Sequence, residues 1–296
     1  MPLELTLLGT GTPTPLVYRA GSSYLVTLDD EVLLFDCGPF CVRRLLEKGV
    51  PPTRVSTLFL THLHYDHCVD YGYLTLVRWD QGAGKIPDLE VYGPPGTARM
   101  TELLFGEEGV YGPDLAARTI HPGSHIVYEV RGGVLPRRRP ESLVQEVGHG
   151  GVVENDRWSV QVAEVVHVQP QLTCLAYRLE AGGHSIVFGG DTAPVQSLVE
   201  LAAGADVLLH MCHFVSGEVT DLRMTSCCSG HLDAARTARD AGVGTLVLVH
   251  LTEQVERPGT RERVLAESAQ IFTGNIIFAE DLLEVPIGAI EVERIQ

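Results

Sequence analysis

Short apolar runs alternate with polar turns through the first sixty residues of the chain. Three of these runs are expected to form β-strands: Glu4–Leu8, Ser23–Leu28 and Val32–Phe35. Apolar residues at helical spacing then predict a helix over Phe40–Lys48 that stops at Gly49, and Val55–Leu60 reads as a continuous apolar strand. This strand–helix–strand order predicts a sheet covered by helices.

The second half of the chain repeats this content. The predicted strands are Trp158–Val168, Cys174–Leu179, Ser185–Phe188, Ala205–His210, Thr245–Val249 and Asn275–Phe278. The predicted helices are Val195–Ala202, Leu232–Ala241 and Arg261–Ile271. The expected class is therefore α/β, a mixed sheet with outer helices.

A stretch rich in glycine, proline and arginine separates the two halves. It runs from Arg131 to Gly151 and contains GGVLPRRRP. The sequence shows neither low complexity nor a repeat of fixed period, which disfavours a solenoid or a propeller. We therefore expect residues 1–296 to form a single domain, with an exposed loop or arm at about 131–151.

Charge narrows the choice of partners. The chain carries 22 basic and 38 acidic side chains, a net charge of -16, which would repel a polyanion unless the positive charge were gathered in one place. The group Arg137–Arg139 is a candidate RNA-binding arm or a solvated loop, and the lack of interleaved aromatic residues favours the loop. We expect a small-molecule substrate and regard nucleic acid as disfavoured.

The N-terminal residues and the cysteines give an expectation for the compartment. The N-terminus has no basic run followed by an apolar stretch, and no apolar segment approaches the roughly 18–20 residues of a membrane span. The seven cysteines are odd in number and scattered, without paired C-x-x-C units. A reducing, cytoplasmic location without membrane contact is the expectation.

The strongest chemical signal is THLHYDH, residues 61–67, directly after the apolar strand Val55–Leu60. His62 and His64 project to one side while the chain is extended, because side chains alternate along a strand. If a helix begins at Asp66, that carboxylate and His67 turn toward a second position nearby. The spacing therefore predicts two adjacent metal sites. Imidazole and carboxylate ligands suit zinc, iron or manganese.

Further motifs give the chain a family resemblance. LLGTGTPTP, LLFDCG, THLHYDH, VVHVQP followed by LAYRL, FGGDT, the pair Gly230-His231, and LVLVH occur in this order between Leu7 and His250. In this order they resemble the motifs of the metallo-β-lactamase superfamily, in the branch of ribonuclease Z and the arylsulfatase-like hydrolases. The resemblance implies a four-layered αββα sandwich with the site on loops at one edge.

The resemblance also implies a ligand set. His62, His64 and His167 would hold one metal ion, Asp66, His67 and His250 a second, and Asp191 would bridge the two. The implied cofactors are two divalent ions, with zinc expected and manganese or iron open.

Three further residues take implied roles. Asp36 in LLFDCG would orient a ligating imidazole. Asp66 and His231 are the expected catalytic residues, His231 as a donor of a hydrogen bond or proton to the substrate. Two metal ions about 3.5–4 Å apart can hold a bridging hydroxide, which would be the nucleophile.

The chain departs from ribonuclease Z in the segment Leu208–Phe214. The corresponding run there resembles His-Glu-Ala-Thr-Phe, and its Glu supports the catalytic histidine, whereas Met211 stands here. The acid–base pair therefore looks incomplete. His210 and His213 could enter the site or could pack beside Met211 and Cys212, and the spacing leaves both readings open.

These observations predict a dinuclear hydrolase acting on a small organic ester, lactone or phosphodiester. Two alternatives remain: a ribonuclease Z-like endonuclease that processes the 3′ end of transfer RNA, and, from another class, a di-iron oxidoreductase or metal sensor. The resemblance also implies a homodimer.

Overall fold

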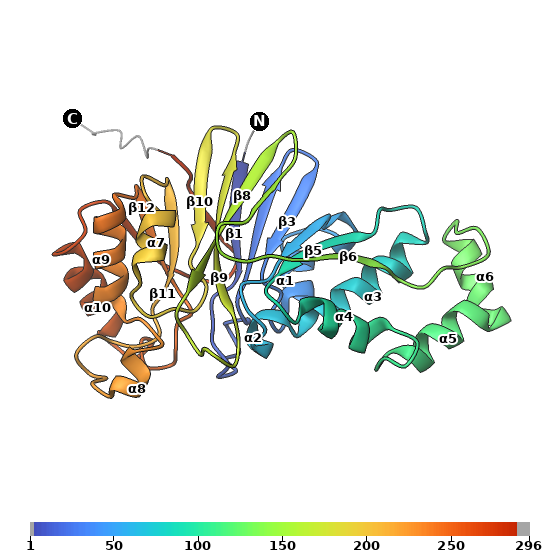
Figure 1. Cartoon of the computed structure of the whole chain (residues 1–296), viewed down its shortest axis with the longest axis horizontal. Helices are drawn as coiled ribbons and strands as arrows, with labels where there is room; N and C mark the ends of the chain where they lie inside the picture. Colours follow the sequence, from blue (N-terminus) through green and yellow to red (C-terminus); the bar gives the residue numbers. More distant parts are fainter. Residues whose placement is uncertain (1–2, 289–296) are drawn as a thin grey trace.

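The computed structural model describes residues 3–288 and contains two seven-stranded sheets packed face to face (Figure 1). The first sheet has the strand order β14-β1-β2-β3-β4-β5-β6. Its strands are β1 (Leu3–Gly9), β2 (Ser23–Leu28), β3 (Glu31–Phe35), β4 (Thr57–Phe59), β5 (Leu89–Gly93), β6 (Ser142–Glu146) and β14 (Leu283–Val285).

The second sheet has the strand order β13-β12-β11-β10-β9-β8-β7. Its strands are β7 (Val152–Glu154), β8 (Trp158–Val165), β9 (Cys174–Ala181), β10 (His184–Phe188), β11 (Val207–Met211), β12 (Thr245–Val249) and β13 (Asn275–Phe278). Each sheet joins antiparallel hairpins to a parallel section, β3 to β6 in the first and β10 to β13 in the second.

Helices cover both outer faces of the sandwich (Figure 1). The first half supplies the short turn η1 (Pro52–Arg54) and the helices α1 (Cys41–Glu47), α2 (Tyr65–Cys68), α3 (Asp70–Gly82), α4 (Thr97–Phe105), α5 (Gly112–Ile120) and α6 (Pro122–Val130). The second half supplies α7 (Gln196–Leu201), α8 (Leu222–Thr225), α9 (His231–Ala241) and α10 (Thr260–Ala269). The predicted αββα sandwich is confirmed.

Aromatic rings join the two sheets at their inner faces. Phe35 of β3 stacks on Phe59 of β4 and on Phe188 of β10, with ring centroids 4.8 and 3.8 Å apart. All three side chains are buried. Burying one such ring contributes about 1.5–3 kcal/mol to the stability of the fold. Phe35, Phe59 and Phe188 are each the last residue of a strand. This packing therefore fixes the strand ends that the site residues follow.

The region between β4 and β7 differs most from the sequence expectation. Five helices and two strands, α2 to α6 with β5 and β6, occupy it, and α5 and α6 reach furthest from the sandwich (Figure 1). The stretch 131–151, expected as an exposed loop or arm, contains β6, which pairs in parallel with β5. Its Arg137 is buried against Trp79 and Tyr128, with the guanidinium carbon 3.8 and 4.9 Å from the ring centroids.

Asp80 holds this arginine-rich stretch to α3. It accepts from Arg118, Arg131 and Arg137 at 3.1, 2.5 and 2.8 Å. These ion pairs therefore hold α5 and the end of α6 against α3.

No helix within residues 3–288 is long and apolar enough to cross a membrane.

Candidate metal centre

The carboxyl ends of the parallel strands meet at one edge of the sandwich, and the predicted site residues follow them. Asp36 comes directly after β3, His250 directly after β12, and Asp191 three residues after β10. His62 and His64 follow β4, and α2 then begins at Tyr65, so that Asp66 and His67 lie in its first turn. Binding residues commonly lie at such strand ends in open α/β sheets.

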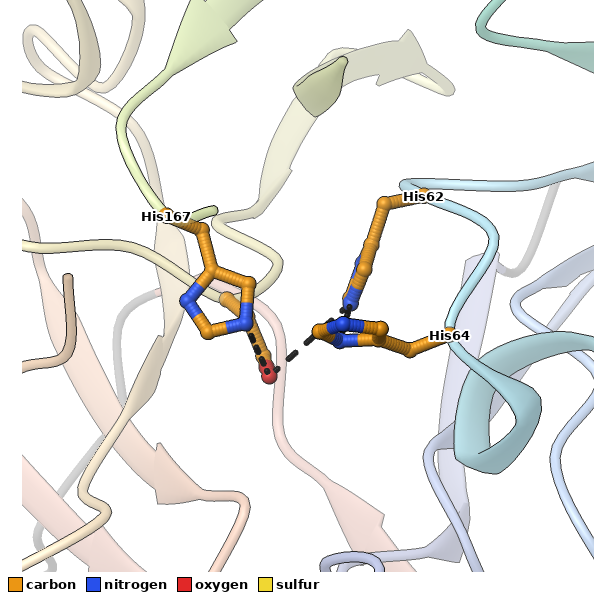
Figure 2. A group of neighbouring side chains, drawn as sticks. His62, His64 and His167 are labelled. Carbon is orange, nitrogen blue, oxygen red and sulfur yellow. Dashed lines mark hydrogen bonds and ion pairs between the residues drawn. The ribbon is translucent and has the colours of Figure 1, made fainter. Parts of the chain in front are cut away.

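One group of ligand candidates consists of His62, His64, His167 and Asp191, whose ligand atoms all lie within 4.8 Å of one another. Figure 2 shows the rings of His62 and His64 facing that of His167 across a common space. The ring centroid of His167 lies 5.5 Å from that of His62 and 5.1 Å from that of His64. His62 and His64 follow a strand of the first sheet and His167 follows a strand of the second, so both sheets contribute to the site.

A second group consists of Asp66, His67 and His250, with the same 4.8 Å limit. Asp66 Oδ2 lies 3.3 Å from His250 Nε2 and 3.5 Å from His67 Nε2. Asp191 touches both groups: its Oδ2 lies 3.2 Å from His250 Nε2 and 3.6 Å from His167 Nε2. The structure thus brings all seven predicted ligands together, with Asp191 between the two groups.

Three polar atoms at this centre lack hydrogen-bond partners. Asp66 Oδ1, His67 Nε2 and Asp191 Oδ1 are buried and have no hydrogen-bond partner among the described residues. His67 Nε2 and Asp191 Oδ1 lie 3.4 Å apart, an ion pair only if the ring is protonated. Leaving a buried polar group unpaired costs about 1–3 kcal/mol, so this cluster points to bound cations. The donor set of imidazoles and carboxylates fits divalent metal ions.

The pKa values of the groups at the centre depend on their neighbours and on burial. Burial raises the pKa of Asp191, but His250 and His67 outweigh it and hold this pKa well below its usual range. Burial lowers the pKa of His62 well below its usual value, and His67 adds to the effect. The neutral imidazole is the form that binds a metal ion.

Asp36 orients a ligand candidate of the centre through hydrogen bonds. Its Oδ2 accepts from His67 Nδ1 at 2.7 Å, and its Oδ1 accepts from the Thr61 backbone N–H at 2.8 Å. The expected orienting role therefore has a direct contact, and the proton is fixed on Nδ1, which leaves Nε2 of His67 for a metal ion. Asp36 has a left-handed φ of 61°, and His250 one of 55°. Such backbone costs about 1–2 kcal/mol per non-glycine residue and clusters at functional sites.

The sequence did not decide whether His210 and His213 enter the site, and the structure places them differently. His213 Nδ1 lies 3.3 Å from His250 Nδ1, so His213 touches a predicted ligand. His210 is buried, with Nδ1 2.9 Å from the Met211 carbonyl oxygen. His213 therefore belongs to the surroundings of the centre and His210 to the core.

His231 lies outside both ligand groups. Its Nε2 is 2.8 Å from Glu267 Oε2 of α10, and its Nδ1 accepts from the Ser216 N–H at 3.1 Å. Sequence reasoning missed Glu267, which lies 36 residues beyond His231 on another helix and carries no local signal. It also missed Cys227, whose carbonyl oxygen accepts from His167 Nδ1 at 2.6 Å. The catalytic role expected for His231 remains a prediction.

Comparison with known proteins supplies a family context. A family model described as "Beta-lactamase superfamily domain" matches residues 32–251. Ribonuclease Z of Mycobacterium bovis is 34% identical over 96% of this chain and 98% of its own length. Ribonuclease Z of Mycobacterium avium is 35% identical over 97% and 99%.

Solved structures share the fold. The metallo-β-lactamase fold protein YhfI of Bacillus subtilis superposes with a TM-score of 0.74 at 21% identity, covering 97% of this chain and all of that one. Human tRNase Z, short form, superposes with a TM-score of 0.68 at 20% identity, with the same coverage.

These relatives correct the expected partners. The expectation of a small-molecule substrate, with nucleic acid disfavoured, is wrong, because the similar curated proteins are ribonucleases. Net charge sums all charged side chains and does not describe the local electrostatic potential at a site that holds cations. The value of -16 therefore could not exclude a polyanion as substrate.

Proposed function

The chain belongs to the beta-lactamase superfamily and is a metal-dependent hydrolase, and from this membership we propose that it is a ribonuclease Z-like endonuclease cleaving precursor transfer RNA. The observation that carries the proposal is the 34% identity to Ribonuclease Z of Mycobacterium bovis over 96% of the chain. The gathering of the seven ligand candidates at one edge supports it.

The proposed cofactors are two zinc ions. His62, His64 and His167 would hold one and Asp66, His67 and His250 the other, with Asp191 shared, and the three unpartnered buried atoms at the centre support this arrangement. When bound, such ions lower the pKa of water and withdraw charge from a phosphoryl group.

Asp66 is the proposed proton acceptor. Its Oδ2 contacts His250, whereas its Oδ1 is buried and unpartnered among the described residues. Before ions bind, burial raises its pKa, but the hydrogen bond from His250 and the charge of His67 outweigh this and lower it. Bound ions would take the place of these protons and keep the carboxylate ionised. An ionised carboxylate with one free oxygen can accept the proton of an attacking water molecule.

His213 is the proposed contact to the anionic substrate. If His250 uses Nε2 for a metal ion, its Nδ1–H donates to His213 Nδ1, and the proton of His213 must then be on Nε2. Burial, together with His250, lowers the pKa of His213 to about 4, so the ring is neutral at pH 7. A neutral Nε2–H can donate a hydrogen bond to a phosphate oxygen.

His231 is the proposed source of the leaving-group proton. The absence of a carboxylate at Met211 argued against this role, but Glu267 places a carboxylate 2.8 Å from His231 Nε2. Since Nδ1 accepts from the Ser216 N–H, proton transfer requires the ring to exchange one of these two partners. The homodimer implied by the family resemblance stays a prediction.

A cleavage assay tests the proposal. Zinc-loaded protein should cut a precursor transfer RNA at one position near its 3′ end, and a chelator or His64→Ala should abolish the cut. His184→Ala is the matched control, because His184 begins β10 and is not among the ligand candidates. Intact precursor after incubation with fully zinc-loaded protein would refute the assignment of RNA as substrate.

A further inference from the structure

Two adjacent thiols lie beside the metal centre. Cys227 and Cys228 follow α8, and their Sγ atoms are 3.8 Å apart. Cys228 Sγ lies 3.9 Å from His167 Nδ1, whereas the other ring nitrogen, Nε2, faces Asp191. The thiols and one nitrogen of His167 lie within 4.8 Å of one another.

We propose that Cys227, Cys228 and His167 form a third cation site, for a thiophilic divalent ion such as Zn²⁺ or Cd²⁺, which regulates the hydrolytic centre through His167. The binding part stands on these three side chains alone. The regulatory part rests on the proposed function, because it concerns a ligand of that centre.

Two of the three distances between the donor atoms match tetrahedral coordination. Two Zn–S bonds of about 2.3 Å at the tetrahedral angle place the sulfur atoms about 3.8 Å apart, and a Zn–N bond of about 2.0–2.1 Å places the nitrogen about 3.6 Å from each sulfur. The observed separations are 3.8 Å between the sulfur atoms and 3.9 Å from Cys228 Sγ to His167 Nδ1. The third separation, from Cys227 Sγ to His167, lies within 4.8 Å, so this sulfur moves by at most about 1 Å to reach the separation of such a site.

The site is reachable and selective. Cys227 is half-buried, whereas Cys228 is 4% exposed, so an ion can enter from the Cys227 side and find a thiol shielded from water behind it. Thiolate ligands favour soft ions over Mg²⁺ and Ca²⁺. On binding, each thiol releases its proton to solvent as its S–metal bond forms, and His167 releases the Nδ1 proton.

His167 couples this site to the hydrolytic centre. Its Nδ1–H now donates to the Cys227 carbonyl oxygen at 2.6 Å, while its Nε2 lies 3.6 Å from Asp191 Oδ2. An ion on Nδ1 displaces that hydrogen bond, which fixes the ring toward the centre. Loss of such an orienting contact typically costs 10–100-fold in metal affinity or activity, so a filled third site should slow hydrolysis.

Cadmium titration of the metal-free chain tests the binding. Wild type should take up about three ions and develop an ultraviolet thiolate-to-cadmium band. The double variant Cys227→Ser/Cys228→Ser should bind one ion fewer without the band, and the single variant Cys227→Ala should do the same if the double variant folds poorly. The matched control is Cys37→Ser/Cys41→Ser, a second pair of thiols, both buried, which should retain the third ion and the band.

The outcomes separate the two parts. A third ion and a band that persist without Cys227 and Cys228, or a wild type that shows neither, would overturn the site. Added Cd²⁺ should slow RNA cleavage by the zinc-loaded wild type about tenfold or more relative to the zinc-loaded double variant, which keeps the hydrolytic centre but lacks the third site. Binding without this difference would overturn the regulation. If the chain cleaves no RNA under any condition, the proposed function fails while the titration still decides the site.

Discussion

His231 Nε2 and Glu267 Oε2 lie 2.8 Å apart, although one residue begins α9 and the other lies near the end of α10. The contact gives the buried imidazole a carboxylate partner. The sequence offered none, because Met211 stands where the family has a glutamate. Burial lowers the pKa of His231, and the opposing effect of Glu267 does not outweigh it. The carboxylate therefore acts mainly by holding the ring in position.

We expect His231→Ala to lower kcat for RNA cleavage by about 10²–10⁴-fold and Glu267→Gln to lower it less, because the amide oxygen still accepts from Nε2–H. Metal content should stay unchanged in both. Rates across pH, with melting temperatures, check this, because Glu267 acts as a positioning residue and its loss should move the pH profile. Variants that melt earlier but keep the wild-type rate per folded molecule would assign both residues to structure alone.

The hydrophobic pattern predicts the strands of the sandwich well where each strand is buried. β2 was predicted as Ser23–Leu28 and β12 as Thr245–Val249, and both have these bounds in the structure. The region from α3 to α6 was not predicted, because its helices are covered on one side and leave apolar residues such as Ile120 and Val130 exposed. Apolar spacing there does not mark a single buried face.

The site divides in the same way. His62 and His64 come from a local pattern. His167, Asp191 and His250 required the order of motifs, because each lies 100 or more positions beyond His67. Contacts such as Cys227 with His167, or Glu267 with His231, arise only from tertiary packing. No spacing rule could predict them.

We expect Asp80→Ala to destabilise the chain by about 2–3 kcal/mol. Removing one partner of a buried ion pair costs about 3–5 kcal/mol, and the side chain of Asp80 keeps 15% exposure while that of Arg137 keeps 2%. Urea denaturation measures the loss. Asp114→Ala is the control, since its pair with Arg118 is exposed and should contribute at most about 1 kcal/mol.

The effect of Asp80 should also depend on pH. Burial raises the pKa of Asp80, but hydrogen bonds from Arg137 and Arg131 outweigh this, so its pKa in the folded chain lies below the unfolded value. Its stabilisation is then fully present above pH of about 4 and is lost as pH falls through the folded pKa. A difference between wild type and Asp80→Ala that grows on acidification would contradict this assignment.

We expect Asp36→Asn to weaken metal binding by about 10–100-fold. The amide can turn its NH₂ toward His67 Nδ1, which removes the acceptor that fixes the ring. Competition with a metal-binding dye measures the change. Asp29→Asn is a matched control, because Asp29 also has a left-handed φ, 53°, but is exposed; an equal loss there would show that the backbone, not the His67 contact, is responsible.

We expect Asp191→Ala to lower metal content more than His231→Ala, while the chain stays folded. Asp191 contacts members of both ligand groups, whereas His231 contacts neither. Elemental analysis after gel filtration checks this, with the exposed Asp240→Ala as control. His64→Ala should abolish hydrolysis without unfolding. Retention of metal by Asp191→Ala together with its loss from His231→Ala would reverse the roles assigned here.

His210 and His213 lie three residues apart, yet their loss should have opposite consequences. His213→Ala removes the acceptor 3.3 Å from His250 Nδ1, so His250 loses its fixed tautomer and metal affinity should fall about 10–100-fold. KM for RNA should also rise, because the substrate loses the proposed Nε2–H donor. His210→Ala leaves a cavity in the core and should cost about 2–3 kcal/mol of stability, with metal affinity and KM of the folded chain unchanged. Because both changes delete the same side chain near the end of one strand, each variant is the control for the other. Metal affinity that falls equally in both would show that the strand end as a whole, and not the contact between His213 and His250, holds the ligand in place.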